Sequence, residues 1–200
     1  MEPLGQAADG GREHLVPLYS RDQIQARVRA LARAIRRDYE GRDLVVVGVL
    51  KGAFVFMADL IRALRLPLVL DFVGLSSYGS RSRSSGSVTI SKPLSLPAQG
   101  RDVLVVEDIL DTGLTMRVLL DYLWAQSPKS VRICALIDKR ERRTEAIPAD
   151  YVGFQLPEGF VVGYGIDYAE RYRALPEIYR VEFGDSPGRD GCEPPGARAP

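Results

Sequence analysis

Apolar residues form four nearly continuous runs along the chain, each of a length typical of a β-strand. The runs cover residues 44–50, 68–75, 103–106 and 131–137. Because they lack the regular polar alternation of a sheet with one solvated face, they predict strands buried on both faces, as in a parallel sheet. Shorter strand-like segments are found at 88–90, 151–156, 160–166 and 178–183.

Helical spacing of apolar residues is found between these runs. Ser20 and Gln23 match a capping box, apolar residues recur at positions 24, 28, 31 and 35, and Gly41 is placed to end that helix. Further helices are predicted over 53–64 and 116–124. Strands that alternate with helices are typical of an α/β domain with a central, mainly parallel sheet flanked by helices.

The third apolar run is followed by the most informative chemistry. It stops at two adjacent carboxylates, Glu107 and Asp108, and the small, hydroxylated turn 111–115 then leads into a helix. A strand, a short turn and a helix N-terminus together favour an anion, and Gly113 allows close backbone approach. Carboxylates would repel a phosphate, so we expect them to face sugar hydroxyls or a Mg²⁺ ion. The alternative, a simple helix cap, needs only one such residue.

Composition excludes several other classes of protein. A net charge of +1 indicates neither nucleic-acid nor lipid-surface binding, and no apolar run approaches the about 20 residues of a membrane helix. The N-terminus lacks the apolar segment of a signal peptide. Cys134 and Cys192 form no disulfide framework or metal cluster, which favours a cytoplasmic location. The only histidine, His14, precedes the first predicted element, which argues against histidine-based catalysis.

Three segments depart from this regular pattern. We expect residues 1–13 to be a loose leader and 184–200, with eight Gly or Pro in seventeen residues, to be a disordered tail. Residues 14–183 then form a single domain. Within it, 76–87 holds seven serines in twelve residues, too polar a composition to bury itself. Long loops inside a domain are often lids over a site, so a flexible lid is predicted there.

The turn after the third run resembles a known family motif. The segment 107–115, Glu-Asp-Ile-Leu-Asp-Thr-Gly-Leu-Thr, is similar to the phosphoribosyl-pyrophosphate motif of type I phosphoribosyltransferases, and more narrowly to that of the hypoxanthine-guanine phosphoribosyltransferases. The likeness extends from about residue 44 to 183. It implies the type I phosphoribosyltransferase fold, with a flexible loop and a small purine-binding hood at about 151–183.

The resemblance also implies which residues bind 5-phosphoribosyl-1-pyrophosphate. Lys51 and Gly52 match the pyrophosphate loop, whose Leu50–Lys51 peptide can be cis, and Arg173 would meet the pyrophosphate. The full implied set is Lys51, Gly52, Glu107, Asp108, Asp111, Thr112, Gly113, Leu114, Thr115 and Arg173. Ser77 and Tyr78 match the lid that excludes water from the reacting centre. Mg²⁺ would be held near Glu107, Asp108 and Asp167.

A second implied set recognises the purine base. Lys139, directly after the fourth run, would donate a hydrogen bond to the purine 6-oxo group, while Phe160 would stack on the ring. The complete set is Ile109, Lys139, Phe160, Val161 and Asp167. The basic residues at 140, 142 and 143 are interpreted as surface. Asp111 is the candidate general base.

The implied reaction is purine salvage: hypoxanthine or guanine displaces pyrophosphate to give IMP or GMP. A homodimer or homotetramer is the implied assembly. Three alternatives stay open at this point. A xanthine or other phosphoribosyltransferase differs only near positions 161 and 167, and an RNA-binding regulator on the same fold would need an extended basic face. A dinucleotide-binding protein would need a Gly-x-Gly-x-x-Gly turn after a strand, which neither candidate turn has.

Overall fold

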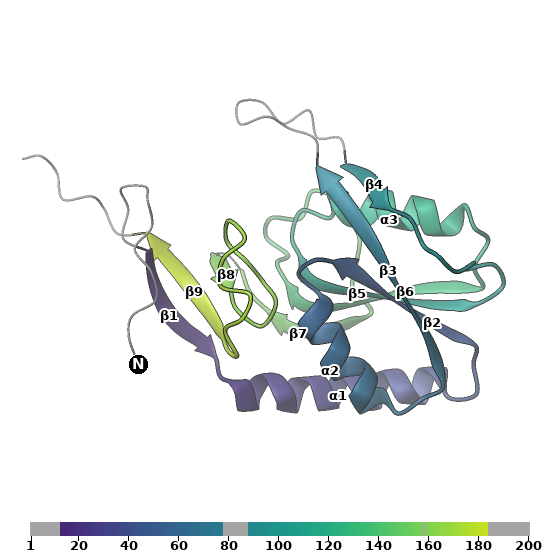
Figure 1. The fold of residues 1–200 in the computed structure, drawn as a ribbon, viewed down its shortest axis with the longest axis horizontal. Helices are drawn as coiled ribbons and strands as arrows, with labels where there is room; N and C mark the ends of the chain where they lie inside the picture. Colours follow the sequence, from purple (N-terminus) through teal and green to yellow (C-terminus); the bar gives the residue numbers. More distant parts are fainter. Residues whose placement is uncertain (1–12, 78–87, 158, 184–200) are drawn as a thin grey trace, which may run out of the picture.

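The chain folds into two sheets of unequal size with helices around the larger one (Figure 1). The computed structural model describes residues 13–77, 88–157 and 159–183. Residues 1–12 of the predicted leader, residues 78–87 of the predicted lid with Tyr78, and the predicted tail 184–200 with Cys192 lie outside the described residues. Glu13 lies in a strand, as do Ser76 and Ser77, which pair with Thr89 and Val88, so the assignment of these three residues to the leader and the lid was wrong. In chain order the elements are β1 (Glu13–Tyr19), α1 (Arg21–Tyr39), β2 (Leu44–Leu50), α2 (Phe54–Leu64), β3 (Leu68–Ser77), β4 (Val88–Lys92), β5 (Asp102–Leu110), α3 (Leu114–Trp124), β6 (Ser130–Asp138), β7 (Tyr151–Gln155), β8 (Phe160–Val162) and β9 (Ile178–Phe183).

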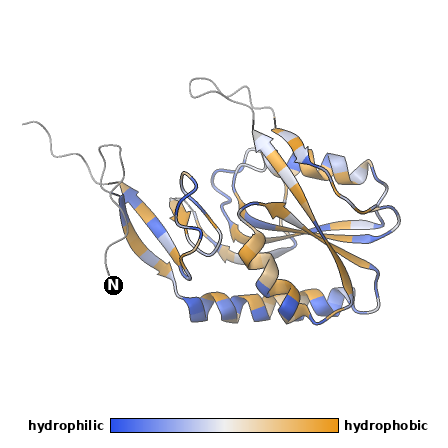
Figure 2. Cartoon of the chain, in the orientation of Figure 1, coloured by the Kyte–Doolittle hydropathy of each residue, from blue (hydrophilic) through white to orange (hydrophobic). Residues whose placement is uncertain are grey.

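The large sheet confirms the predicted central, mainly parallel architecture. Its strand order is β4-β3-β2-β5-β6-β7, and every neighbouring pair is parallel except β3 with β4. Figure 2 shows the apolar colouring concentrated on its inner strands. Alternate residues of those strands belong to two hydrophobic cores, one on each face of the sheet. Val46 and Leu104 pack with α1 and α2, whereas Val47 and Val105 pack with α3. Both faces are therefore covered, which explains the continuous apolar runs.

Most of the predicted helix boundaries are confirmed. Ser20 and Gln23 form the capping box reciprocally, with Ser20 N donating to Gln23 Oε1 at 2.8 Å. The cap at the other end is Glu40 and not Gly41, which follows it with φ +74°. Within the described part of the chain, no helix combines the length and apolar composition that crossing a membrane requires.

The small sheet contains a strand that the sequence pattern did not predict. Its order is β1-β9-β8, all antiparallel, and His14 lies inside β1 opposite Glu182. The placement of His14 before the first element was therefore wrong. Strand β1 carries polar residues and Pro17, and its partner β9 lies over 150 positions away, so no local signal marks it. The predicted hood at 151–183 corresponds only in part to this small sheet. Strand β7, at the start of that range, belongs to the large sheet, and β1, outside the range, belongs to the small sheet.

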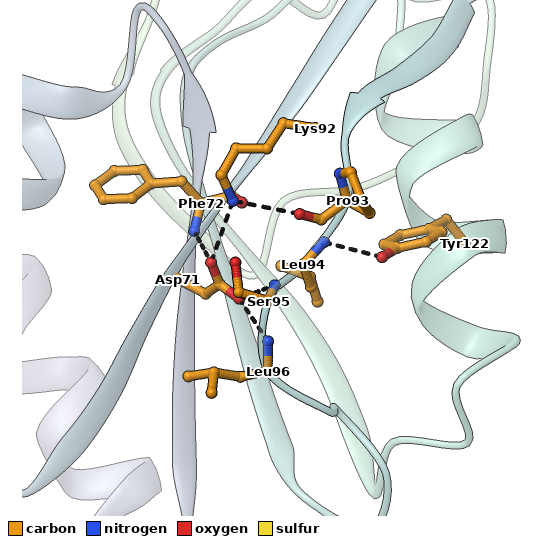
Figure 3. A network of polar contacts seen from close by, with 8 residues as sticks. All are labelled: Asp71, Phe72, Lys92, Pro93, Leu94, Ser95, Leu96 and Tyr122. Atoms are coloured by element: carbon orange, nitrogen blue, oxygen red, sulfur yellow. Dashed lines mark hydrogen bonds and ion pairs between the residues drawn. The ribbon is translucent and has the colours of Figure 1, made fainter.

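A buried carboxylate ties the segment after β4 to the large sheet (Figure 3). Asp71 accepts hydrogen bonds from the backbone N–H groups of Phe72 at 2.7 Å, Ser95 at 2.6 Å and Leu96 at 3.0 Å, and Lys92 Nζ lies 3.5 Å away. Burial alone would raise the pKa of Asp71, but the hydrogen bonds outweigh it and lower the pKa. The ionised carboxylate is therefore the form that the fold stabilises.

Replacing Asp71 by asparagine is expected to lower the free energy of unfolding by about 2 kcal/mol at pH 7, because hydrogen bonds to a charged acceptor are lost. A carboxyl whose pKa is lowered by folding stabilises above its unfolded pKa of about 3.9 and loses that contribution as the pH falls through the folded value. The difference between wild type and variant should therefore shrink below pH 4. Urea unfolding over pH 3–7 measures it. Asp43→Asn, which removes an exposed pair with Arg101, should cost less; an equal loss would contradict this account.

Candidate active site

The carboxyl ends of the central strands bring the predicted site residues to one edge of the large sheet. Lys51 and Gly52 follow β2, Glu107 and Asp108 lie near the end of β5, and Lys139 follows β6. In open parallel sheets this edge is where ligands bind. Strand β5 continues to Leu110, so the predicted strand end at the two carboxylates was wrong by two residues. The acidic pair is consequently held by the sheet itself, in register with β6.

An open helix N-terminus forms the anion-binding part of the site. Helix α3 begins at Leu114, and its cap residue Gly113 has φ +88° and supplies no side-chain hydrogen bond. The first intrahelical bond runs from Arg117 N to Gly113 O at 2.8 Å, so the N–H groups before it have no partner within the helix, and Leu114 N donates to Thr112 Oγ1 at 3.5 Å. Thr112 O accepts from Thr144 N at 2.9 Å and fixes the turn from behind. A phosphate is the natural ligand of such a turn.

The acidic pair lies in an environment that disfavours two charges. Burial and the neighbouring Asp108 raise the pKa of Glu107, and burial raises the pKa of Asp108 as well. Asp108 Oδ1 accepts from Ile109 N at 2.9 Å. Both pKa shifts favour the protonated carboxyl groups and so act against repulsion of a nearby anion. Hydroxyl groups or a cation would suit the oxygens of this pair.

Two cations face a common carboxylate beside the acidic pair. Lys51 Nζ lies 3.0 Å from Glu170 Oε2, and Arg173 Nη2 lies 3.2 Å from the same oxygen. Arg173 also pairs with Asp167 at 2.8 Å. The Leu50–Lys51 peptide is cis. Glu170 was not among the predicted site residues, because nothing in its local sequence distinguishes it from a solvated glutamate.

A further group of predicted site residues combines an exposed aromatic ring with a buried lysine. Phe160 is half exposed and contacts Tyr168 and Phe183 edge-on, with ring centroids 6.2 and 5.8 Å away. Lys139 is buried, and its Nζ donates to Gly159 O at 2.6 Å. Burial lowers the pKa of Lys139. A flat ring that stacks on Phe160 would thus lie near a fixed donor.

The basic cluster after β6 is more than surface. Arg143 is mostly buried and donates to Asp111 O at 3.1 Å and Leu110 O at 3.2 Å, and it pairs with Asp138. Its interpretation as a surface residue was wrong, because it ties the end of β5 to the loop after β6. Arg142 Nη1 lies 3.3 Å from Asp111 Oδ2. Arg140 and Arg142 are exposed, at 69% and 52% of their side chains, so the surface interpretation holds for these two.

The two carboxylate oxygens of Asp111 differ in their contacts. Its Oδ1 is buried and has no hydrogen-bond partner among the described residues, while its Oδ2 faces Arg142. Among the residues that the structure describes, no three acidic, histidine or cysteine side chains converge on one point to hold a metal by themselves. The hard oxygen donors nonetheless suit Mg²⁺, which usually takes one or two carboxylates and completes its shell with water and phosphate oxygens.

Comparison with known proteins agrees with this geometry. The family model described as "Phosphoribosyl transferase domain" matches residues 18–169. A hypoxanthine-guanine phosphoribosyltransferase of Aquifex aeolicus is 47% identical over 166 residues, which are 82% of this chain and 93% of that protein. The bifunctional protein TilS/HprT of Listeria innocua is 51% identical over 161 residues, 80% of this chain, and the chain spans a quarter of its length.

A solved structure gives the same result for the fold. The crystal structure of a hypoxanthine-guanine phosphoribosyltransferase from Bacillus anthracis superposes with a TM-score of 0.80 and 45% sequence identity, over 86% of this chain and 99% of that one. The chain therefore belongs to the phosphoribosyl transferase family and, within it, to the hypoxanthine-guanine phosphoribosyltransferases.

Proposed function

We propose that the protein transfers the 5-phosphoribosyl group of 5-phosphoribosyl-1-pyrophosphate to hypoxanthine, and also to guanine. The products are IMP or GMP and pyrophosphate. The observation that carries the proposal is the meeting, at one sheet edge, of four features: an open helix N-terminus, a buried acid pair, two cations and a stacking surface beside a buried lysine. Each feature matches one part of the two substrates.

Each part of the site has a role in this reaction. The backbone of 111–115 holds the 5′-phosphate, and Glu107 with Asp108 accepts hydrogen bonds from the ribose hydroxyls. Lys51 and Arg173 neutralise the pyrophosphate as its bond to C1′ breaks, and a purine nitrogen forms the new bond to C1′. The transition state carries positive charge on the ribose, so catalysis comes mainly from positioning and charge stabilisation. Asp111 takes the proton that the purine loses.

Mg²⁺ is the proposed cofactor. It would enter with the pyrophosphate group, take oxygens from the substrate and from Asp108 or Asp167, and withdraw charge from the leaving group. Asp167 accepts from Glu170 N at 2.8 Å and pairs with Arg173, so its carboxylate is already oriented at the cation pair. We also propose a cytoplasmic location and an assembly of two or four copies.

A substrate panel tests the proposed function. Purified protein is mixed with 5-phosphoribosyl-1-pyrophosphate, Mg²⁺ and hypoxanthine, guanine, xanthine, adenine or uracil, and nucleotide formation is followed by absorbance. Conversion of hypoxanthine and guanine that stops when a chelator is added supports the proposal. Conversion of xanthine or uracil alone would reassign the substrate, and no conversion by folded protein would remove the enzymatic role. Binding of labelled RNA to the same sample would then identify the regulator.

Replacing Phe160 by leucine should raise KM for hypoxanthine by roughly tenfold, because stacking on an aromatic ring contributes about 1–3 kcal/mol per base. KM for 5-phosphoribosyl-1-pyrophosphate should stay near the wild-type value, since Phe160 is assigned to the purine base and not to the pyrophosphate. Initial rates at varied base concentration measure this. Trp124→Leu removes another half-exposed aromatic ring, at the end of α3, and should leave both KM values unchanged. Equal effects in both variants would remove the stacking role from Phe160.

A further inference from the structure

Residues 163–165 form a turn with a strained backbone next to Arg173. Gly163, Tyr164 and Gly165 have φ values of +96°, +53° and +98°, so three consecutive residues adopt the left-handed region. Two of them are glycine, which tolerates this conformation, but Tyr164 carries a large side chain. A residue with a side chain persists in this conformation only where its surroundings fix it. The question is therefore what holds Tyr164.

Both α1 and α2 contribute to the contact that holds it. The buried Tyr164 side chain donates its hydroxyl hydrogen to Asp59 Oδ2 on α2 at 2.6 Å. The same carboxylate accepts from Gln25 Nε2 on α1 at 2.5 Å and pairs with Arg62. Burial raises the pKa of Tyr164; it also acts to raise the pKa of Asp59, but the hydrogen bonds to Tyr164, Gln25 and Arg62 lower it. A protonated phenol therefore faces an ionised carboxylate.

The same turn contacts Arg173 and the loop that carries Lys51, the two residues proposed to bind the pyrophosphate. Gly165 O accepts from Arg173 Nη1 at 3.0 Å, and Gly165 N donates to Arg173 O at 3.0 Å. A Cβ atom on Gly165 would lie 2.5 Å from Gly52 O, so the turn packs backbone to backbone against the loop after β2. The turn thus touches both the guanidinium of Arg173 and the loop that carries Lys51.

We propose that Tyr164 and Asp59 are positioning residues for the pyrophosphate half of the substrate, because their hydrogen bond fixes the 163–165 turn against which Arg173 and Gly52 are placed. This inference rests on the proposed function. The purine side has a separate support: β8 pairs with β9, with Phe160 opposite Val181. Loss of the Tyr164 hydroxyl should therefore affect one substrate and spare the other.

The test compares two tyrosine-to-phenylalanine variants. Tyr151 OH donates to Asp38 on α1 at 2.5 Å, so Tyr151→Phe removes the same kind of bond away from the cations. Tyr164→Phe should raise KM for 5-phosphoribosyl-1-pyrophosphate and the inhibition constant of pyrophosphate by roughly tenfold, as expected for one hydrogen bond to a charged group. KM for hypoxanthine should stay near wild type, and Tyr151→Phe should change none of these constants. A rise of both KM values in Tyr164→Phe, or of neither, would overturn the proposal.

A double-mutant cycle separates the pair from each residue alone. Asp59→Asn should raise the same two constants, and adding Tyr164→Phe to it should give little further change, because both variants weaken the same Tyr164–Asp59 contact. Additive effects would show that Asp59 and Tyr164 act separately and would contradict the proposal. The substrate panel with the wild-type protein separates failure of the proposed function from failure of this inference. If the wild type shows no turnover, the proposed function fails. If the wild type turns over and Tyr164→Phe leaves KM for 5-phosphoribosyl-1-pyrophosphate and the inhibition constant of pyrophosphate unaltered, only the positioning role is removed.

Discussion

Replacing Asp111 by asparagine is expected to lower kcat by about 100-fold, within the range of general acid–base catalysis, with both KM values close to wild type. Asp111 Oδ1 is buried without a hydrogen-bond partner among the described residues, so it is free to accept a proton. Asparagine keeps the shape of the side chain and the contact of its backbone oxygen with Arg143, but it cannot take a proton at the reacting centre. Binding should therefore persist while proton transfer fails.

Single-turnover kinetics with hypoxanthine measure this prediction, since they report the chemical step apart from product release. Asp121→Asn is the matched control, because Asp121 is an exposed aspartate on α3, the helix whose first turn belongs to the site. It should leave kcat unchanged. A rise in KM for 5-phosphoribosyl-1-pyrophosphate with normal kcat in Asp111→Asn would assign Asp111 to phosphate binding instead of proton transfer.

The parts of the fold that the sequence predicted well are those with local signals. Continuous apolar runs identified β2, β5 and β6 because both faces of these strands are buried, and Ser20 with Gln23 marked the start of α1 because capping acts within one turn. Strand β1 had no such signal, since its partner β9 is far along the chain. The end of β5 was placed too early because carboxylates normally leave a strand, whereas here Glu107 and Asp108 both lie within it.

The site divides in the same way between local and long-range information. The motif at 107–115 and the residues Lys51 and Lys139 could be predicted because strand ends in a parallel sheet meet at one edge. The roles of Glu170, Arg143 and Asp59 depend on contacts with residues 33 to 119 positions away, and their own neighbours in sequence carry no pattern. Their contribution appears only when the chain is folded.

The contact between Gly52 and Asp108 gives the second prediction. A Cβ atom at position 52 would lie 1.7 Å from Asp108 Oδ2 and 2.4 Å from its Cγ, so either the loop or the carboxylate must move. Asp108 cannot rotate away freely, because its Oδ1 accepts from Ile109 N at 2.9 Å. Gly52 is not among the glycines with positive φ. The effect of an added methyl group there is therefore steric and is not due to backbone conformation.

Gly52→Ala should consequently reduce kcat/KM for 5-phosphoribosyl-1-pyrophosphate by about 100-fold, as expected when reacting groups are misplaced by about 1 Å. Gly100→Ala provides the opposite case: Gly100 has φ +70° but nothing within 4 Å of an added Cβ, and it lies before β5 at the far end of the sheet. It should lower the melting temperature and leave kcat/KM unchanged. Steady-state kinetics and thermal unfolding of both variants separate the two effects. Near-normal kcat/KM in Gly52→Ala would mean that the loop and Asp108 tolerate displacement, so that the acidic pair would not require its observed position for catalysis.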